Sequence, residues 1–356
     1  MSALIVLAVI AIAQAVFLAA LAGFILYRRS RARVVALFVA PRIDEARRTL
    51  RAWVAGTGTV APIMDAMRRL PRAAALEFAA DAAATVLAAE AHAAFAFALR
   101  DEPWFRHTVR FAASRRWWER RQAARALALA GTADDRDALA ALLRDPEPAV
   151  AVIALSALAR VPEPGLVGDA LDRYPTLPPV IRRFVLGALT AVRDVVEAPL
   201  IARIDGRAGA GARAAWIDLA VHLNLTGALL ASARHATDPD ARVREAVARA
   251  YGGLPSASTL DALGRMIVDP IVEVRTAAAR ALGRVGSPRG TDLLERALHD
   301  PAWAVRYAAA IALAQLGERG RSALLALRGD ADRFVAEVAT VISGLSDGAL
   351  LELSAD

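Results

Sequence analysis

The sequence predicts an all-α solenoid of stacked antiparallel helix pairs that follows one N-terminal transmembrane helix. Alanine makes up roughly a quarter of the 356 residues and aromatic residues only 6%, a composition that favours closely packed helices over sheets. Asp-Pro dipeptides recur at intervals of 31 residues, which is the size of a helix-pair repeat. The chain begins with an uncharged apolar stretch that is long enough to cross a bilayer.

Charge and cysteine content exclude several classes of function. The 44 cationic residues are all arginine, against 37 Asp and Glu, and cysteine is absent. A chain rich in Ala and Arg and without Lys is typical of a GC-rich genome, so its net charge of +7 is weak support for a nucleic-acid partner. We therefore expect no nucleic-acid partner, and the lack of cysteine excludes disulfides, thiolate catalysis and thiolate zinc sites.

The N-terminal stretch Ala3–Tyr27 contains no charged side chain. Its 25 residues would form about 37 Å of helix, against a bilayer core of roughly 30 Å. A cleaved signal peptide, the alternative, would need a positive region before a shorter apolar core. The first cations instead follow the stretch, at Arg28, Arg29, Arg31 and Arg33. The positive-inside rule then predicts a single-pass protein of the inner (cytoplasmic) membrane with its N-terminus outside and the solenoid in the cytoplasm; a reversed, periplasmic topology is the alternative.

Four regions follow from this organisation: an anchor with its Arg-rich flank (1–33), a juxtamembrane stalk and divergent helical cap (34–113), the repeat solenoid (114–346) and a C-terminal tail (347–356). The apolar run Val34–Ala40 is too short to span a membrane, so it either lies at the interface or continues the anchor helix. The Ala-rich stretch Ala73–Leu99 contains charged residues whose insertion would be costly. We expect it to form a buried pair of helices.

A 31-residue period organises the solenoid. Asp238, Asp269 and Asp300 each precede a proline at this spacing, and Asp145 lies three periods before Asp238. An arginine follows each of the three later aspartates by six residues, and the same spacing extended backwards predicts further arginines and fails once, at Ala151. The arginines on this lattice are Arg120, Arg182, Arg213, Arg244, Arg275 and Arg306. The eight repeats begin near residues 114, 145, 176, 207, 238, 269, 300 and 330.

Each repeat is expected to be one helical pair. The aspartate suits a helix N-cap and the proline suits the first helical position. An amphipathic Ala-rich helix follows, Gly283 and Gly286 end it in one copy, and Ser287-Pro288 opens the second helix. Two such helices cannot bury their apolar faces alone, whereas stacked copies share one continuous core.

The pattern Asp-Pro-x-x-x-Val-Arg-x-Ala-Ala-x-x-Ala-Leu-Gly at Asp269–Gly283 resembles the short HEAT-like repeats named after phycobilisome lyases. The resemblance covers residues 114–346, and the whole chain is similar to bacterial membrane-anchored HEAT-repeat proteins, whose roles are mostly inferred as scaffolding. It implies that Asp and Arg of successive repeats form a hydrogen-bond ladder. Arg120, Arg182 and Arg213, whose repeats lack the Asp, would be freer to point elsewhere.

One segment, Trp104–Arg121, stands out as a candidate partner-binding patch. It contains six arginines and one glutamate interleaved with aromatic residues, a mixture suited to an acidic protein partner, a membrane surface or stacked nucleic-acid bases. The alternative is that the tryptophans seal the first repeat and the arginines are merely solvated. The candidate binding residues are Arg106, Arg110, Arg115, Arg116, Trp117 and Trp118.

Nothing in the sequence indicates catalysis. The five histidines are scattered, and neither a Gly-rich phosphate loop nor a Gly-x-Ser-x-Gly motif is present. We expect no catalytic residue, cofactor or metal site. The predicted function is a membrane-anchored scaffold or adaptor for a protein partner such as an integral membrane or envelope-assembly complex. The alternative implied by the resemblance is a HEAT-like enzyme of the DNA-glycosylase or phycobilin-lyase kind.

Overall fold

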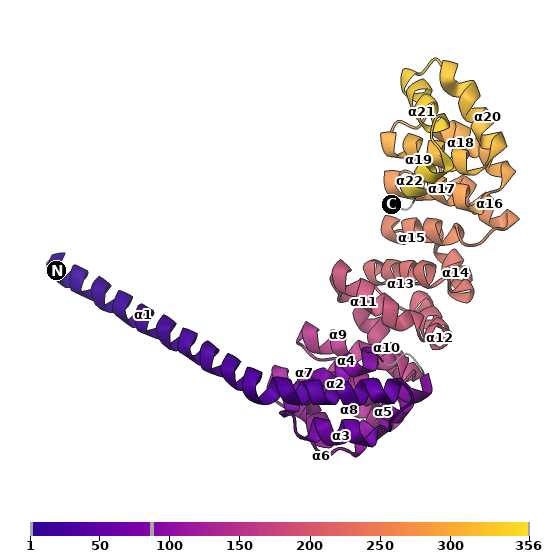
Figure 1. Ribbon diagram of the computed structural model, residues 1–356. Coiled ribbons are helices and arrows are strands. Elements are labelled where there is room, and N and C mark those ends of the chain that lie inside the picture. The colour runs from indigo at the N-terminus through magenta and orange to yellow at the C-terminus, as the bar shows by residue number, and fades with distance from the viewer. Residues whose placement is uncertain (1–2, 86–88, 355–356) are drawn as a thin grey trace. The chain divides into compact units, whose positions relative to one another are not determined.

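The computed structural model describes residues 3–85 and 89–354, which form helices joined by short turns, without a strand (Figure 1). The all-α solenoid prediction is confirmed. The chain divides into two compact units, Met1–Leu142 and Leu143–Asp356. The helices of the first unit are α1 (Ala3–Val34), α2 (Ala40–Val54), α3 (Ala61–Arg68), α4 (Arg72–Thr85), α5 (Ala89–Asp101), α6 (Pro103–Val109), α7 (Trp117–Ala130) and α8 (Arg136–Leu143), which ends at the boundary.

Helix α1 is 32 residues long and projects from the other helices of its unit (Figure 1). A π-helical turn, Val35–Val39, joins it to α2. Its large apolar side chains from Ile12 to Leu26 are 43–67% exposed. The predicted membrane crossing Ala3–Tyr27 lies in this helix, although the side chains of residues 1–11, 13 and 15 are outside what the structure describes. Within the described part of the chain, no helix combines the length and the apolar character that a membrane crossing requires.

The core of the first unit is shared by α2 to α7. Phe95, Leu99 and Phe105 are almost completely buried, and Ala126 and Ala130 of α7 join the same cluster. The stretch Ala73–Leu99 contributes buried side chains from both α4 and α5, as predicted. The first repeat helix therefore packs directly on the helices that precede the array.

The second unit is an array of helix pairs. Its helices are α9 (Pro148–Leu155), α10 (Pro164–Arg173), α11 (Pro179–Thr190), α12 (Arg193–Asp205), α13 (Ala210–Leu223), α14 (Thr226–Ser232), α15 (Ala241–Tyr251), α16 (Ala257–Met266), α17 (Val272–Val285), α18 (Thr291–Ala297), α19 (Trp303–Gln315), α20 (Glu318–Ala326), α21 (Arg333–Ser343) and α22 (Asp347–Ser354). The first helices of successive pairs, the odd-numbered α9 to α21, pack side by side in one layer. Small residues allow this close approach, because a Cβ at Gly283 of α17 would lie 2.8 Å from the Cα of Ala312 in α19.

The start of each repeat differs from the prediction. The first helices begin three residues after the aspartate, at Ala241, Val272 and Trp303. The aspartate does not cap the helix, and the proline does not occupy the first helical position. Instead, Oδ1 of the aspartate accepts a hydrogen bond from the backbone N–H two residues later, 2.9 Å away at Asp269 and 2.8 Å at Asp300. The Asp-Pro pair therefore shapes the turn between repeats, and the residue after that turn begins the helix.

Candidate interaction surfaces

Arginine side chains of the lattice connect consecutive repeats. Arg275 Nε and Nη2 donate to the two carboxylate oxygens of Asp300 at 2.7 and 2.9 Å, while its Nη1 donates to the backbone oxygen of Asp269 at 2.8 Å. Arg244 repeats this geometry with Asp269 at 2.8 and 2.9 Å. Each guanidinium thus joins the turn of its own repeat to the aspartate of the next. The pKa of Asp269 is lowered: burial opposes its ionisation, and the hydrogen bonds from Arg244 and from the backbone N–H of Ile271 outweigh that effect.

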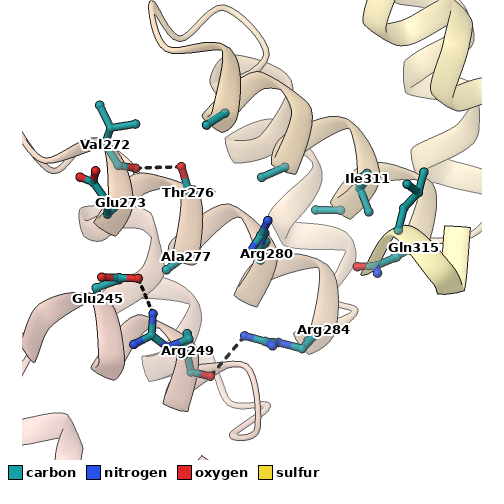
Figure 2. A pocket seen from close by; sticks show the side chains of 14 residues that line it. Glu245, Arg249, Val272, Glu273, Thr276, Ala277, Arg280, Arg284, Ile311 and Gln315 are labelled. Atoms are coloured by element: carbon teal, nitrogen blue, oxygen red, sulfur yellow. Dashed lines mark hydrogen bonds and ion pairs between the residues drawn. The ribbon is translucent and has the colours of Figure 1, made fainter. Parts of the chain in front are cut away.

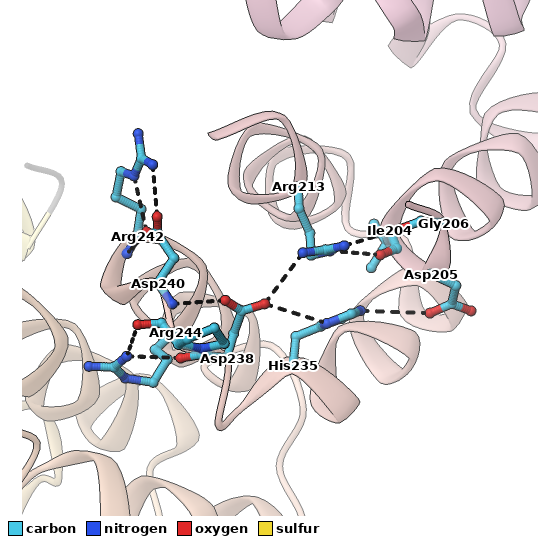
Figure 3. Close-up of polar contacts among 10 residues, drawn as sticks. Ile204, Asp205, Gly206, Arg213, His235, Asp238, Asp240, Arg242 and Arg244 are labelled. Atoms are coloured by element: carbon cyan, nitrogen blue, oxygen red, sulfur yellow. Dashed lines mark hydrogen bonds and ion pairs between the residues drawn. The ribbon is translucent and has the colours of Figure 1, made fainter. Parts of the chain in front are cut away.

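The ladder weakens toward both ends. Arg213 Nη1 lies 3.4 Å from Asp238 Oδ2, with its other donors on the backbone oxygens of Ile204 and Gly206 (Figure 3). Arg213 therefore does not point elsewhere, because its acceptor belongs to the next repeat. Arg306 pairs with Asp332 at 3.6 Å.

The remaining lattice positions bind backbone carbonyls. Arg182 donates to Leu177 O and Pro175 O at 3.0 and 2.6 Å, and Arg120 donates to Ser114 O at 3.0 Å. Asp145 is buried and accepts from the Glu147 N–H at 2.9 Å. The lattice is thus engaged in the turns and junctions of the array, which leaves little of it for a partner.

His235 extends the ladder near Arg213. Its ring lies between Asp205 and Asp238, with nitrogen-to-oxygen distances of 3.9 Å on each side (Figure 3). Burial and the neighbouring Arg213 guanidinium lower the pKa of the imidazole, against the opposing effect of the two carboxylates. The neutral ring is therefore favoured in the folded chain.

A second set of links between repeats was not recognised in the sequence. Arg249 Nε and Nη2 donate to the carboxylate of Asp218 at 2.8 and 3.0 Å, and Arg203 Nε donates to Asp172 at 2.7 Å. Both pairs are separated by 31 residues, the repeat period. Opposite charges one period apart were therefore the signal that could have identified them.

The tryptophans of the predicted patch lie at the surface of the first unit. Trp117 and Trp118 open α7 and are 40% and 47% exposed, with their rings edge to face at 6.2 Å. Arg121 lies over the Trp117 ring at 5.3 Å and Arg116 over the Trp118 ring at 5.8 Å. The buried face of α7 consists of other residues, such as Leu127. The pair therefore contributes an exposed aromatic surface crossed by guanidinium groups.

The other patch residues differ in how they are held. Arg116 pairs with Glu119 at 3.3 Å. The pKa of Glu119 is lowered by the hydrogen bond from the Ser114 hydroxyl and by Arg116. Arg106 donates to the backbone oxygen of Asp101 at 3.0 Å. Arg110 and Arg115 are exposed in the same segment.

The described residues contain no cluster of three or more His, Asp or Glu side chains that could hold a metal ion. The polar geometry is instead that of a repeat protein: paired helices, small residues where helices touch, and a ladder that joins neighbours. These features define an α-solenoid repeat protein.

Residues 226–314 match the family of HEAT repeats. This part of the second unit therefore consists of HEAT repeats. No curated protein sequence matches it. Solved structures with a similar arrangement include an engineered protein (17% identity, 80% of this chain and 89% of the other covered, TM-score 0.36). A second is YibA of Escherichia coli (20% identity, 68% of this chain and 96% of the other covered, TM-score 0.38). A third is human deoxyhypusine hydroxylase in complex with glycerol (17% identity, 78% of this chain and 97% of the other covered, TM-score 0.29).

Proposed function

We propose that this chain is a non-enzymatic scaffold that binds a protein partner through the surface around Trp117 and Trp118. The observation that carries the proposal is the exposed tryptophan pair crossed by Arg116 and Arg121. Trp and Arg are the residue types that most often dominate binding energy at protein interfaces. The excess of arginine predicts an acidic partner surface with an apolar centre.

We further propose that α1 tethers the scaffold to the inner membrane, with the solenoid in the cytoplasm. The support comes from the uncharged sequence Ala3–Tyr27, from the arginines that follow it and from the exposed apolar side chains of α1. Leu37 and Phe38, 68% and 59% exposed, extend the apolar surface beyond this stretch. Carbonate extraction of membranes tests the tether: the full chain should stay in the pellet, and release into the supernatant would overturn this part of the proposal. A reporter fused to the C-terminus tests the orientation.

The partner proposal is tested by quantitative affinity purification of the full chain from solubilised membranes at native expression. A W117A/W118A variant should lose a specific, stoichiometric protein partner. Trp303 is the matched control, because it is 61% exposed and lies in the second unit; Trp303→Ala should retain the partner. Circular dichroism must show an unchanged melting temperature for both variants.

Two results would refute the proposal. Retention of every partner by the tryptophan variant would show that the pair does not bind. Selective loss of nucleic acid or of vesicle binding, with all proteins retained, would assign the patch to a different class of ligand.

A further inference from the structure

A groove lies on the layer of first helices in the second unit. It has a volume of about 360 Å³ and is lined by α15, α17 and α19 (Figure 2). Ala277, Ala308 and Ile311 form an apolar floor. The second helices α16, α18 and α20 contribute no lining residue to this groove, whereas the last helix, α22, contributes Leu353. It is in the opposite unit from Trp117 and Trp118, so any inference about it goes beyond the proposed function.

One end of the groove is strongly cationic. Arg249, Arg280 and Arg284 line it, and Figure 2 shows the three side chains close together. Arg249 is neutralised by Asp218 and Glu245. Among the described residues, Arg280 and Arg284 have no carboxylate partner, and Arg284 donates a hydrogen bond to the backbone oxygen of Arg249 at 3.4 Å. Burial and the two neighbouring arginines lower the pKa of Arg284.

The sequence makes room for this guanidinium. A Cβ at Gly252 would lie 2.6 Å from Arg284 Nε, so a glycine allows the arginine to lie against α15. Glu273, in the first turn of α17, lines the other end of the groove. The groove therefore changes from acidic to cationic along α17, which favours a ligand with its negative charge at the arginine end.

Helix α22 shows what kind of ligand the groove accepts. The second helices α18 and α20 pack alongside each other, whereas α22 packs on α19, in the layer of first helices (Figure 1). Its Leu350 is 6% exposed, and Leu353 reaches the groove while remaining 39% exposed. Residues 347–356 contain three acidic residues and no cation. A short acidic helix with leucines on one face thus already covers part of the groove.

We propose that this groove binds an acidic, leucine-bearing helix of a partner protein, and that α22 is an internal competitor that the partner must displace. The seated α22 packs on α19 and contributes Leu353 to the lining of the groove. The two arginines without carboxylate partners supply the charge attraction for the incoming helix. Because α22 is tethered, it acts at an effective concentration of about millimolar, so a partner must bind more tightly than α22 does by itself.

A labelled peptide with the sequence of residues 347–356 serves as the probe, and fluorescence anisotropy with the full chain measures its binding. Replacing Leu350 and Leu353 by Asp should release α22 and raise the affinity for the peptide by about tenfold or more. Adding R280E and R284E to that release variant should lower the affinity by about tenfold. The matched control is R289E with R296E, which changes the charge equally at exposed positions of the second-helix layer and should have no effect.

Hydrogen exchange on the unmodified chain tests the displacement of α22 without relying on any variant. Excess peptide should increase exchange in α22 and decrease it in α17. Several results would overturn the proposal: no gain of affinity on release of α22, equal binding by the charge-reversed and control variants, or unchanged exchange in α22. A dimer formed by the release variant, seen by light scattering, would also overturn it, because the groove would then belong to a second copy of this chain.

Discussion

Replacing Arg275 by Ala tests whether the ladder holds neighbouring repeats together. The guanidinium is 11% exposed and the Asp300 carboxylate 10% exposed, and the pair is bidentate. The substitution removes two charge-assisted hydrogen bonds and the bond to the Asp269 carbonyl, and it leaves Asp300 with only its turn hydrogen bond from Ala302. A charged hydrogen bond contributes about 1.5–3 kcal/mol, and the loss of one partner of a buried pair costs about 3–5 kcal/mol. Since this pair is not fully buried, we expect the free energy of unfolding to fall by about 2–4 kcal/mol.

Urea denaturation followed by circular dichroism at 222 nm measures this loss. Arg242 is the control: it pairs with Asp240 inside one repeat, its side chain is 66% exposed, and its replacement by Ala should change little. D300N keeps the turn hydrogen bond and removes the charge, so a double-mutant cycle of R275A with D300N isolates the pair itself.

A coupling energy near zero in that cycle would refute the structural role of the ladder. So would equal losses for R275A and R242A. An unchanged unfolding transition combined with lost partner binding would instead make the lattice a recognition surface.

Two further predictions address helix contact and pH. Gly283→Ala should destabilise the array by about 1–3 kcal/mol in the same urea assay, because its Cβ would overlap Ala312. A Cβ at Gly187 in α11 would meet nothing within 4 Å, so Gly187→Ala should stabilise the array by about 0.5–1 kcal/mol. If both substitutions changed the free energy of unfolding in the same direction, the packing argument would be contradicted. The pKa of His235 is lower in the folded chain than its ordinary 6.5, so the unfolded chain takes up the proton first and stability should fall as pH drops from about 6.5 to the folded pKa. Thermal melts between pH 7 and 5 should show this fall, and the melting temperature of H235Q should change less over that range. If the unmodified chain and H235Q had the same dependence of melting temperature on pH, the fall would belong to other groups. Asp269, whose pKa is lowered, should lose its contribution only below about pH 3.8, outside that window.

The repeat architecture could be predicted because side chains at equivalent positions of successive repeats contact one another, so that their spacing recurs along the sequence. The lattice from Arg213 to Arg306 and the Asp-Pro turns are visible as spacing alone. The prediction that the aspartate caps the helix was wrong. A helix cap and a turn both use an Asp oxygen that accepts a hydrogen bond from a nearby backbone N–H. Sequence cannot separate these two uses when the helix start differs by only two or three residues.

The groove and the position of α22 could not be predicted. From sequence, this short segment with leucines and acidic residues is identified only as a C-terminal tail, and its docking on α19 depends on the space that the array leaves there. The cationic end also arises only in three dimensions, because Arg249 and Arg284 belong to different repeats. Exposure at Trp117 and Trp118 was likewise undecided by sequence, since aromatic residues at a helix start serve a core or a surface equally well.

The ladder also gives the array a mechanical strength that varies along its length. Four arginines, at positions 213, 244, 275 and 306, each join their own turn to an aspartate of the following repeat. The bonds are shortest in the Arg244–Asp269 and Arg275–Asp300 pairs and longer at Arg213 and Arg306. A pull on the last repeats would meet the weaker Arg306 contact before the bidentate pairs. The array should therefore lengthen stepwise under load: the end repeats separate first, and the central repeats keep their contacts longest.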